Sequence, residues 1–216
     1  MSDENAVAAV APAPNDPRTL KHMIIWGDPH IGDDKEYVTL KRAFISNIDP
    51  CFDTASSTTE KDLTNLMCTN DTHTIRFGEP QSVLLCCTTV QECCAAFDTY
   101  RNKKVFFITS GKMGREILPR IEKDFKILFT DPVTKEACLS IYLFCGSIDK
   151  HADLVEKHKE HVRMVNHDAD LLERVTMDAA AYYFTLGERA KQDGKPEEAE
   201  VYFAWSAKLS SNYETL

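Results

Sequence analysis

A short glycine-containing run between a strand-like and a helix-like segment has the composition of an anion site. Residues 110–114 read Ser-Gly-Lys-Met-Gly, and backbone N–H groups at such a junction can bind a phosphate or another anion. The spacing matches neither the Walker motif, which needs four residues between its first Gly and Gly-Lys, nor GxGxxG. The candidate anion-binding residues are Ser110, Gly111, Lys112 and Gly114. The competing interpretation is a tight strand-to-helix turn whose glycines supply the backbone angles.

A second run, Asp28-Pro29-His30 followed by Gly32-Asp33-Asp34, resembles the opening Asp-x-His of metallophosphoesterases. In that family the Asp and His ligate a metal that activates water. Residues 166–168 (Asn-His-Asp) resemble the later Asn-His element, but no Gly precedes them and no Gly-His-x-His follows. We therefore interpret the run as an acidic loop that caps a helix. Asp28 and His30 remain the metal candidates, and we predict no bound metal or other cofactor.

The remaining histidines and the cysteines offer no catalytic pattern. His158 and His161 lie one helical turn apart among charged residues, which is typical of a solvated helix face. The eight cysteines include the vicinal pairs 86–87 and 93–94 and show no CxxC or zinc-ligand spacing. We expect buried free thiols in a reducing cytoplasm and no catalytic residue.

Composition and charge narrow the classes of partner. The 216 residues carry a formal net charge of −9, whereas nucleic acids and anionic membranes bind basic surfaces. No apolar run is long enough to span a bilayer or to resemble a secretory signal. We therefore expect a cytoplasmic protein without nucleic-acid or membrane partners. Residues 1–20, acidic and rich in Ala and Pro, are predicted to be a disordered tail.

The elements that position these residues alternate between strand-like and helix-like segments. Apolar runs with the length of buried strands cover 23–26, 82–87, 104–109, 140–145 and, more weakly, 161–166. Helical apolar stripes cover 35–48, 91–100, 115–125 and 152–161. This alternation predicts an α/β domain with a doubly wound, mainly parallel five-stranded sheet of the flavodoxin-like or Rossmann-like kind. A receiver domain shares that fold, but Thr109-Ser110 stands where its phosphorylated Asp would end the third strand.

Two stretches interrupt the alternation. Residues 50–80 are rich in Ser, Thr, Asn and Asp, which predicts a long loop or insertion with a short helix around 62–67. Residues 126–138 contain Asp-Pro-Val-Thr, which predicts a turn between two extended pieces and a hairpin added at the sheet edge. The α/β domain is thus expected over 21–167, with these two insertions.

Residues 168–216 are predicted to form two amphipathic helices, and their pattern resembles the tetratricopeptide repeat. That repeat has a large residue, Leu-Gly, a turn Gly and then Ala, Phe and a small residue at set spacings. The matching positions are Tyr183, Leu186, Gly187, Gly194, Ala199, Phe203 and Ser206. Ala190 and Ser211 depart from the pattern, where an aromatic residue and Pro are usual.

The resemblance implies a particular packing. Gly187 and Ala199 are expected to let the helices approach closely, with Phe203 in the groove beside Leu186. Stable arrays need about three repeats, because each repeat buries its faces against its neighbours. A lone hairpin must therefore lean on the α/β domain, on another copy of the chain or on a partner.

The central part of the chain has a second resemblance. Residues 105–121, Val-Phe-Phe-Ile-Thr-Ser-Gly-Lys-Met-Gly-Arg-Glu-Ile-Leu-Pro-Arg-Ile, are followed at 140–145 by Ser-Ile-Tyr-Leu-Phe-Cys. This pattern resembles an uncharacterised α/β domain of rotifer and other invertebrate multidomain proteins, over about residues 23–190. There it precedes tetratricopeptide repeats and sometimes a mono-ADP-ribosyltransferase domain, which has no counterpart here. The resemblance implies a regulatory or scaffolding role.

We therefore predict a non-catalytic cytoplasmic module for protein–protein interaction or self-assembly. Its partner is expected to be another protein or a second copy of the chain, as a homo-oligomer. The residues expected to form the contact surface are Tyr183, Leu186, Phe203 and Trp205. The alternative is a nucleotide- or metal-binding enzyme or sensor with its site at the carboxyl ends of the strands.

Overall fold

The computed structural model describes residues 21–33, 35–48, 74–77 and 81–213. Its strands are β1 (His22–Gly27), β2 (Thr74–Phe77), β3 (Gln81–Cys87), β4 (Lys104–Ser110), β5 (Ile141–Phe144) and β6 (Val162–Val165). The α-helices are α1 (Val38–Ile48), α3 (Val90–Thr99), α4 (Gly111–Arg120), α5 (Ala152–Lys157), α6 (Asp168–Gln192) and α7 (Pro196–Tyr213). Short 3₁₀ or π turns cover Ile121–Phe125, Lys126–Phe129 and Ile148–His151. The expected tail at 1–20 and the expected helix at 62–67 lie outside the described residues.

The sheet has the strand order β2-β3-β1-β4-β5-β6. The strands from β3 to β6 are parallel, and in chain order these five run 2-1-3-4-5, which is the flavodoxin-like order. All five predicted strands are therefore confirmed. The sixth strand, β2, pairs antiparallel with β3. This strand falls in the stretch 50–80, which was predicted to be a loop. Four residues are too few to show the alternating hydrophobic pattern of a strand, so β2 was not predicted.

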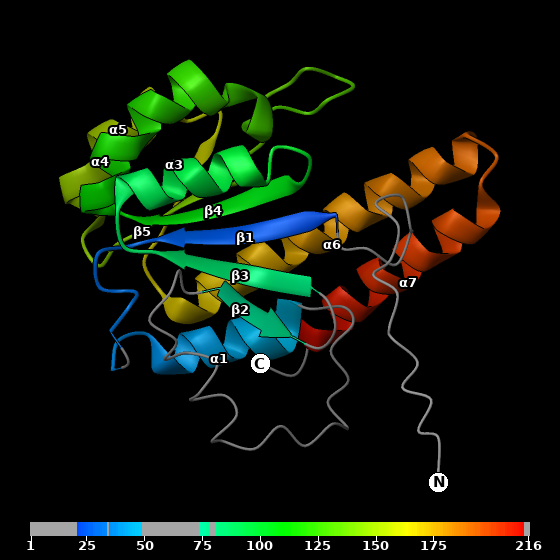
Figure 1. Ribbon diagram of the computed structural model, residues 1–216, viewed down its shortest axis with the longest axis horizontal. Helices are drawn as coiled ribbons and strands as arrows, with labels where there is room; N and C mark the ends of the chain where they lie inside the picture. Colours follow the sequence, from blue (N-terminus) through cyan, green and yellow to red (C-terminus); the bar gives the residue numbers. More distant parts are fainter. Residues whose placement is uncertain (1–20, 34, 49–73, 78–80, 214–216) are drawn as a thin grey trace, which may run out of the picture.

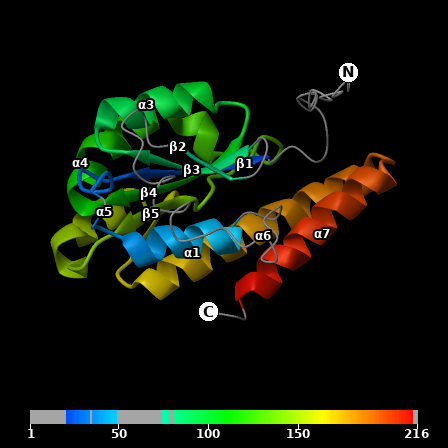
Figure 2. The ribbon, with the colours of Figure 1, turned by 60° about the horizontal axis from the view of Figure 1, so that its bottom comes forward.

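Helices cover both faces of the sheet (Figure 2). Alternate residues of β1 enter different cores: Ile24 and Trp26 pack with α1, α6 and α7, whereas Met23 and Ile25 pack with α3 and α4. Strands buried on both faces lack a polar side, which explains why their sequences show apolar runs instead of alternation.

The long helix α6 belongs to two parts of the structure at once. Leu171, Leu172 and Val175, near its start, are buried in the same core as β1 and α1. Its second half pairs with α7, and this end of the hairpin extends past the amino ends of the strands (Figure 1). Packing is therefore continuous across the domain boundary expected at residue 168.

The stretch 126–138 does not add a hairpin to the sheet. Residues Lys126–Phe129 are a 3₁₀ turn, and one isolated antiparallel bridge joins Thr130 to Ala137. The predicted turn is present, since Asp131 Oδ1 accepts hydrogen bonds from the N–H groups of Val133 and Thr134. Asp131 also pairs with Arg189 of α6 at 2.9 Å, so this loop is attached to the helical hairpin.

Candidate functional site

The turn between α6 and α7 is formed by residues suited to helix ends. Gly194 lies in the turn with a φ of 73°, a left-handed conformation that glycine adopts without steric cost. Pro196 is the first residue of α7. A backbone N–H at this position would have no partner within the helix, so proline, which lacks one, loses nothing there. Arg189 and Lys191 near the end of α6, and Glu197 near the start of α7, have the charges that favour these helix ends.

The two helices approach each other closely at Gly187. A Cβ at this position would lie 2.6 Å from Cε1 of Phe203, well inside van der Waals contact. Ala190 and Ala199, nearer the turn, are both buried. Gly187 thus allows the close approach of the helices that was expected there.

Tyr183 lies between the hairpin and the sheet. Its side chain is fully buried, and its hydroxyl lies 2.8 Å from Nδ1 of His22 and accepts a hydrogen bond from the N–H of Lys21. The ring of Trp205 packs edge-on against it at 5.1 Å. The prediction that Tyr183 forms part of a contact surface is wrong, because it fixes the hairpin to the start of β1.

The other three predicted surface residues are only half-buried, and all pack against the core that contains β1 and α1. These residues are Leu186, Phe203 and Trp205. Other large apolar side chains of the hairpin are exposed to solvent: Phe184 is 54% exposed and Met177 is 40% exposed. Phe184 lies against Phe203, with ring centroids 5.5 Å apart. Met177 and Phe184 are seven residues apart on α6, so they lie on the same side of the helix and form a second apolar stripe. This spacing is the signal in the sequence that could have revealed it.

At the carboxyl ends of the strands, the predicted anion run forms the junction of β4 and α4. Ser110 ends β4 and Gly111 begins α4, so the helix starts earlier than the predicted residue 115 and no loop intervenes. The Ser110 hydroxyl is enclosed, has no hydrogen-bond partner among the described residues and does not cap α4. Lys112 is exposed on the first turn of α4.

The two glycines of this run make room for neighbouring side chains. Neither has a positive φ, so the interpretation that they supply unusual backbone angles is wrong. A Cβ at Gly111 would collide with the ring of His151, and one at Gly114 would lie 2.7 Å from Cδ1 of Leu143. Side chains therefore cover both glycines.

Asp28 and His30 form a turn. Asp28 is buried, and its Oδ1 accepts a hydrogen bond from the backbone N–H of His30 at 2.7 Å, while the His30 side chain is exposed. Burial and the nearby carboxylate of Asp28 raise the pKa of Tyr37 to about 12. Within the described ranges, no group of three or more His, Cys, Asp or Glu side chains could hold a metal ion.

The prediction of a solvated histidine pair is wrong for His158. Its side chain is 2% exposed, with Nδ1 2.8 Å from Oε1 of Glu122. Both residues line a pocket of about 220 Å³ together with Lys126, Glu156, Lys157, Lys159, Glu160 and His161. This pocket is smaller than the roughly 300–1,000 Å³ of typical ligand sites. Its three lysines and three glutamates leave no net charge to select an ion.

The thiols of the core are poor nucleophiles. Burial raises the pKa of Cys86 to about 12. A hydrogen bond with Cys93, and then burial, raise the pKa of Cys87. Partial burial also raises the pKa of Cys94, although Cys94 lies in the first turns of α3. Because the thiolate is the reactive form, these cysteines act as small apolar side chains.

No family model, no curated protein and no solved structure matches this chain. Among the described helices, none is both long and apolar enough to cross a membrane. The functional conclusion therefore rests on the fold and on its side chains.

Proposed function

We propose that this chain is a non-catalytic protein–protein interaction module that associates with a second copy of itself through the α6–α7 hairpin. The observation that carries the proposal is the open apolar stripe of the hairpin, on which Phe184 and Met177 are exposed. One side of the hairpin is already covered, since α1 packs against both α6 and α7. The stripe is thus the uncovered part of a tetratricopeptide-like unit, and such units bury their faces against neighbours.

The energetics favour covering this stripe. Complete burial of a phenylalanine side chain is worth about 1.5–3 kcal/mol, and more than half of Phe184 remains to be buried. Phe203 beside it enlarges the apolar area, and aromatic residues are enriched in the buried centres of interfaces. The free thiols of the described cysteines support a reducing compartment such as the cytoplasm as its location.

The test is the solution mass by light scattering on a sizing column, across a concentration series. The wild-type chain is expected to shift from monomer to dimer as concentration rises, and Phe184→Ser to remain monomeric at every concentration. Ile127→Ser is the matched control, because Ile127 is 73% exposed but lies outside the hairpin. A wild-type chain that stays monomeric throughout would contradict self-association. Crosslinking from position 184 would then identify a different protein as the partner.

A further inference from the structure

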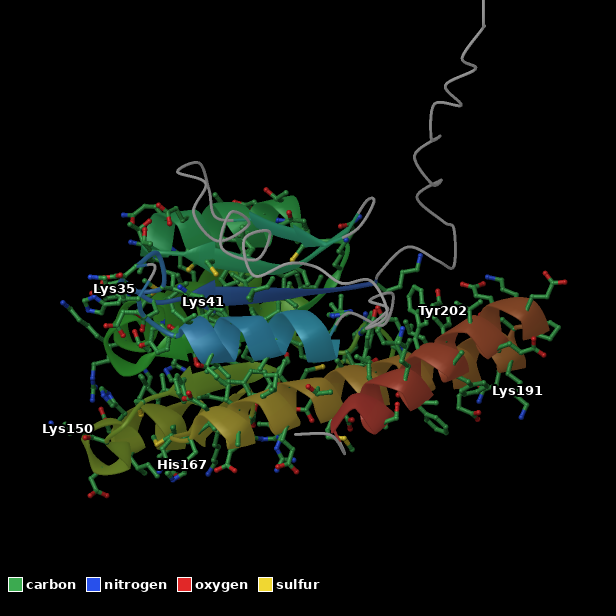
Figure 3. All side chains as sticks on the ribbon, turned by 90° about the horizontal axis from the view of Figure 1, so that it is seen from below. Lys35, Lys41, Lys150, His167, Lys191 and Tyr202 are labelled. Atoms are coloured by element: carbon green, nitrogen blue, oxygen red, sulfur yellow. The ribbon has the colours of Figure 1, made fainter. Side chains whose placement is uncertain are left out.

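Lys41 is a lysine whose side chain is almost entirely removed from water. It lies in the first turns of α1 and is 4% exposed. Figure 3 shows it between α1 and the sheet, near the carboxyl end of β1, with Lys35 further out at the same end of the molecule. Lysine is one of the residue types least often buried unless it is paired with an opposite charge.

The ammonium group of Lys41 uses only one of its three N–H donors among the described residues. It donates one hydrogen bond, to the backbone carbonyl of Asp33 at 3.1 Å. No carboxylate of the described residues lies within ion-pair distance of it. An ammonium has three N–H donors, and a buried charge without a counter-charge is costly. The position therefore has both the charge and the free donors that an anion requires.

Two features of the surroundings of Lys41 are common at ligand sites. Open α/β sheets bind ligands outside the carboxyl ends of their strands, which is the end where the β1–α1 turn lies. Tyr37, whose carbonyl accepts the backbone N–H of Lys41 at 2.7 Å, has a φ of 57°. An aromatic residue in this left-handed region is strained, and such strain is concentrated at ligand-binding and active sites. Asp28, which directly follows β1, accepts the N–H of His30.

We propose that Lys41 anchors a binding site for a small oxyanion, specifically a phosphate group, either free or carried by a nucleotide. The ammonium supplies a compact positive charge and its two unused donors, and phosphate oxygens are strong acceptors. Binding would give this buried ammonium a counter-ion, which no carboxylate of the described residues supplies. The site is independent of the hairpin stripe, so self-association and phosphate binding succeed or fail separately.

The test compares Lys41→Met with the wild-type chain in thermal unfolding and calorimetric titration. Inorganic phosphate at a hundredfold excess over Kd is expected to raise the wild-type Tm by about 5–10 °C. Lys41→Met is expected to show no heat of binding and no such rise. Without phosphate it is expected to melt at or above the wild-type temperature, since an apolar chain replaces an unpaired buried charge. The matched control is Lys35→Met, which removes an exposed lysine three residues before α1 and is expected to respond like wild type.

Adenosine monophosphate in the same titration distinguishes the two sources of the phosphate group. A Kd at least tenfold below that of inorganic phosphate would assign the site to a nucleotide, and equal or weaker binding would assign it to the free ion. The proposal is overturned if Lys41→Met retains the phosphate response, or if the wild-type chain shows none. A Lys41→Met variant that melts well below wild type in phosphate-free buffer would also overturn it, because the ammonium would then be a satisfied structural group.

Discussion

Lowering the pH from 7 to 3 is expected to remove about 4 kcal/mol of stability through His22 alone. Burial, and secondarily the charge of Lys103, lower the pKa of His22 from 6.5 to about 3. In the unfolded chain the imidazole of His22 binds its proton near pH 6.5, whereas in the folded chain it does so only near pH 3. Between these two pH values the unfolded state therefore holds more protons than the folded state. The stability is complete above pH 6.5 and is lost as the pH falls toward 3, at about 1.4 kcal/mol per unit.

The measurement is urea unfolding at a series of pH values for wild type and His22→Leu. Carboxylates titrate in both proteins, so the difference between the two profiles isolates His22. The variant is expected to lose less stability than wild type over this range, while the N–H of Lys21 continues to donate to Tyr183. His30→Leu is the control, because His30 is exposed and its removal is expected to leave the wild-type slope. Parallel profiles for wild type and His22→Leu would contradict the assignment.

Replacing Gly187 by Val is expected to destabilise the chain by about 1–3 kcal/mol, the usual cost of overpacking a filled site. On helix propensity alone, the loss of a mid-helix glycine would be neutral or stabilising. Here the new side chain would occupy the space of the Phe203 ring, whose nearest atoms lie 2.6 and 2.7 Å from the Cβ position. A loss of stability in Gly187→Val would therefore indicate that α6 and α7 are in close contact at this position, whereas no loss would indicate that they are not.

A double-mutant cycle tests that contact. Phe203→Ala should reduce the penalty of Gly187→Val, with a coupling energy of about 1 kcal/mol or more, because the overlapping ring is gone. Ala181→Val on the exposed side of α6 is the control, and its effect should stay within about 0.5 kcal/mol. Strict additivity of the two hairpin substitutions would show that the helices do not meet at Gly187.

The hydrophobic pattern was sufficient for the five parallel strands and for the existence of the main helices. It was weaker at boundaries: α4 begins at Gly111 instead of 115, and α5 ends at Lys157 instead of 161. Glycine is unfavourable within helices, so the sequence argued against a helix over 110–114. Close packing of His151 and Leu143 over Gly111 and Gly114 outweighs that local preference.

The candidate sites were predictable only in part. A helical stripe shows which residues share a side, but not which neighbour covers that side. Tyr183 therefore looked available for a partner, although the start of β1 encloses it, and Phe184 on the next position is the open one. His158 is a similar case, since Glu122 lies 36 positions away in the chain and in contact with it in the fold.

By itself, the sequence determined the α/β class, the parallel sheet and the two C-terminal helices with the glycine turn between them, because these depend on periods and turn residues that act locally. Only the tertiary structure decided the strand order, the antiparallel β2, the exposed stripe at Phe184 and the burial of Lys41. Those features depend on contacts between residues far apart in the chain. Charge and exposure at such positions follow from what packs against them, and no local pattern encodes that.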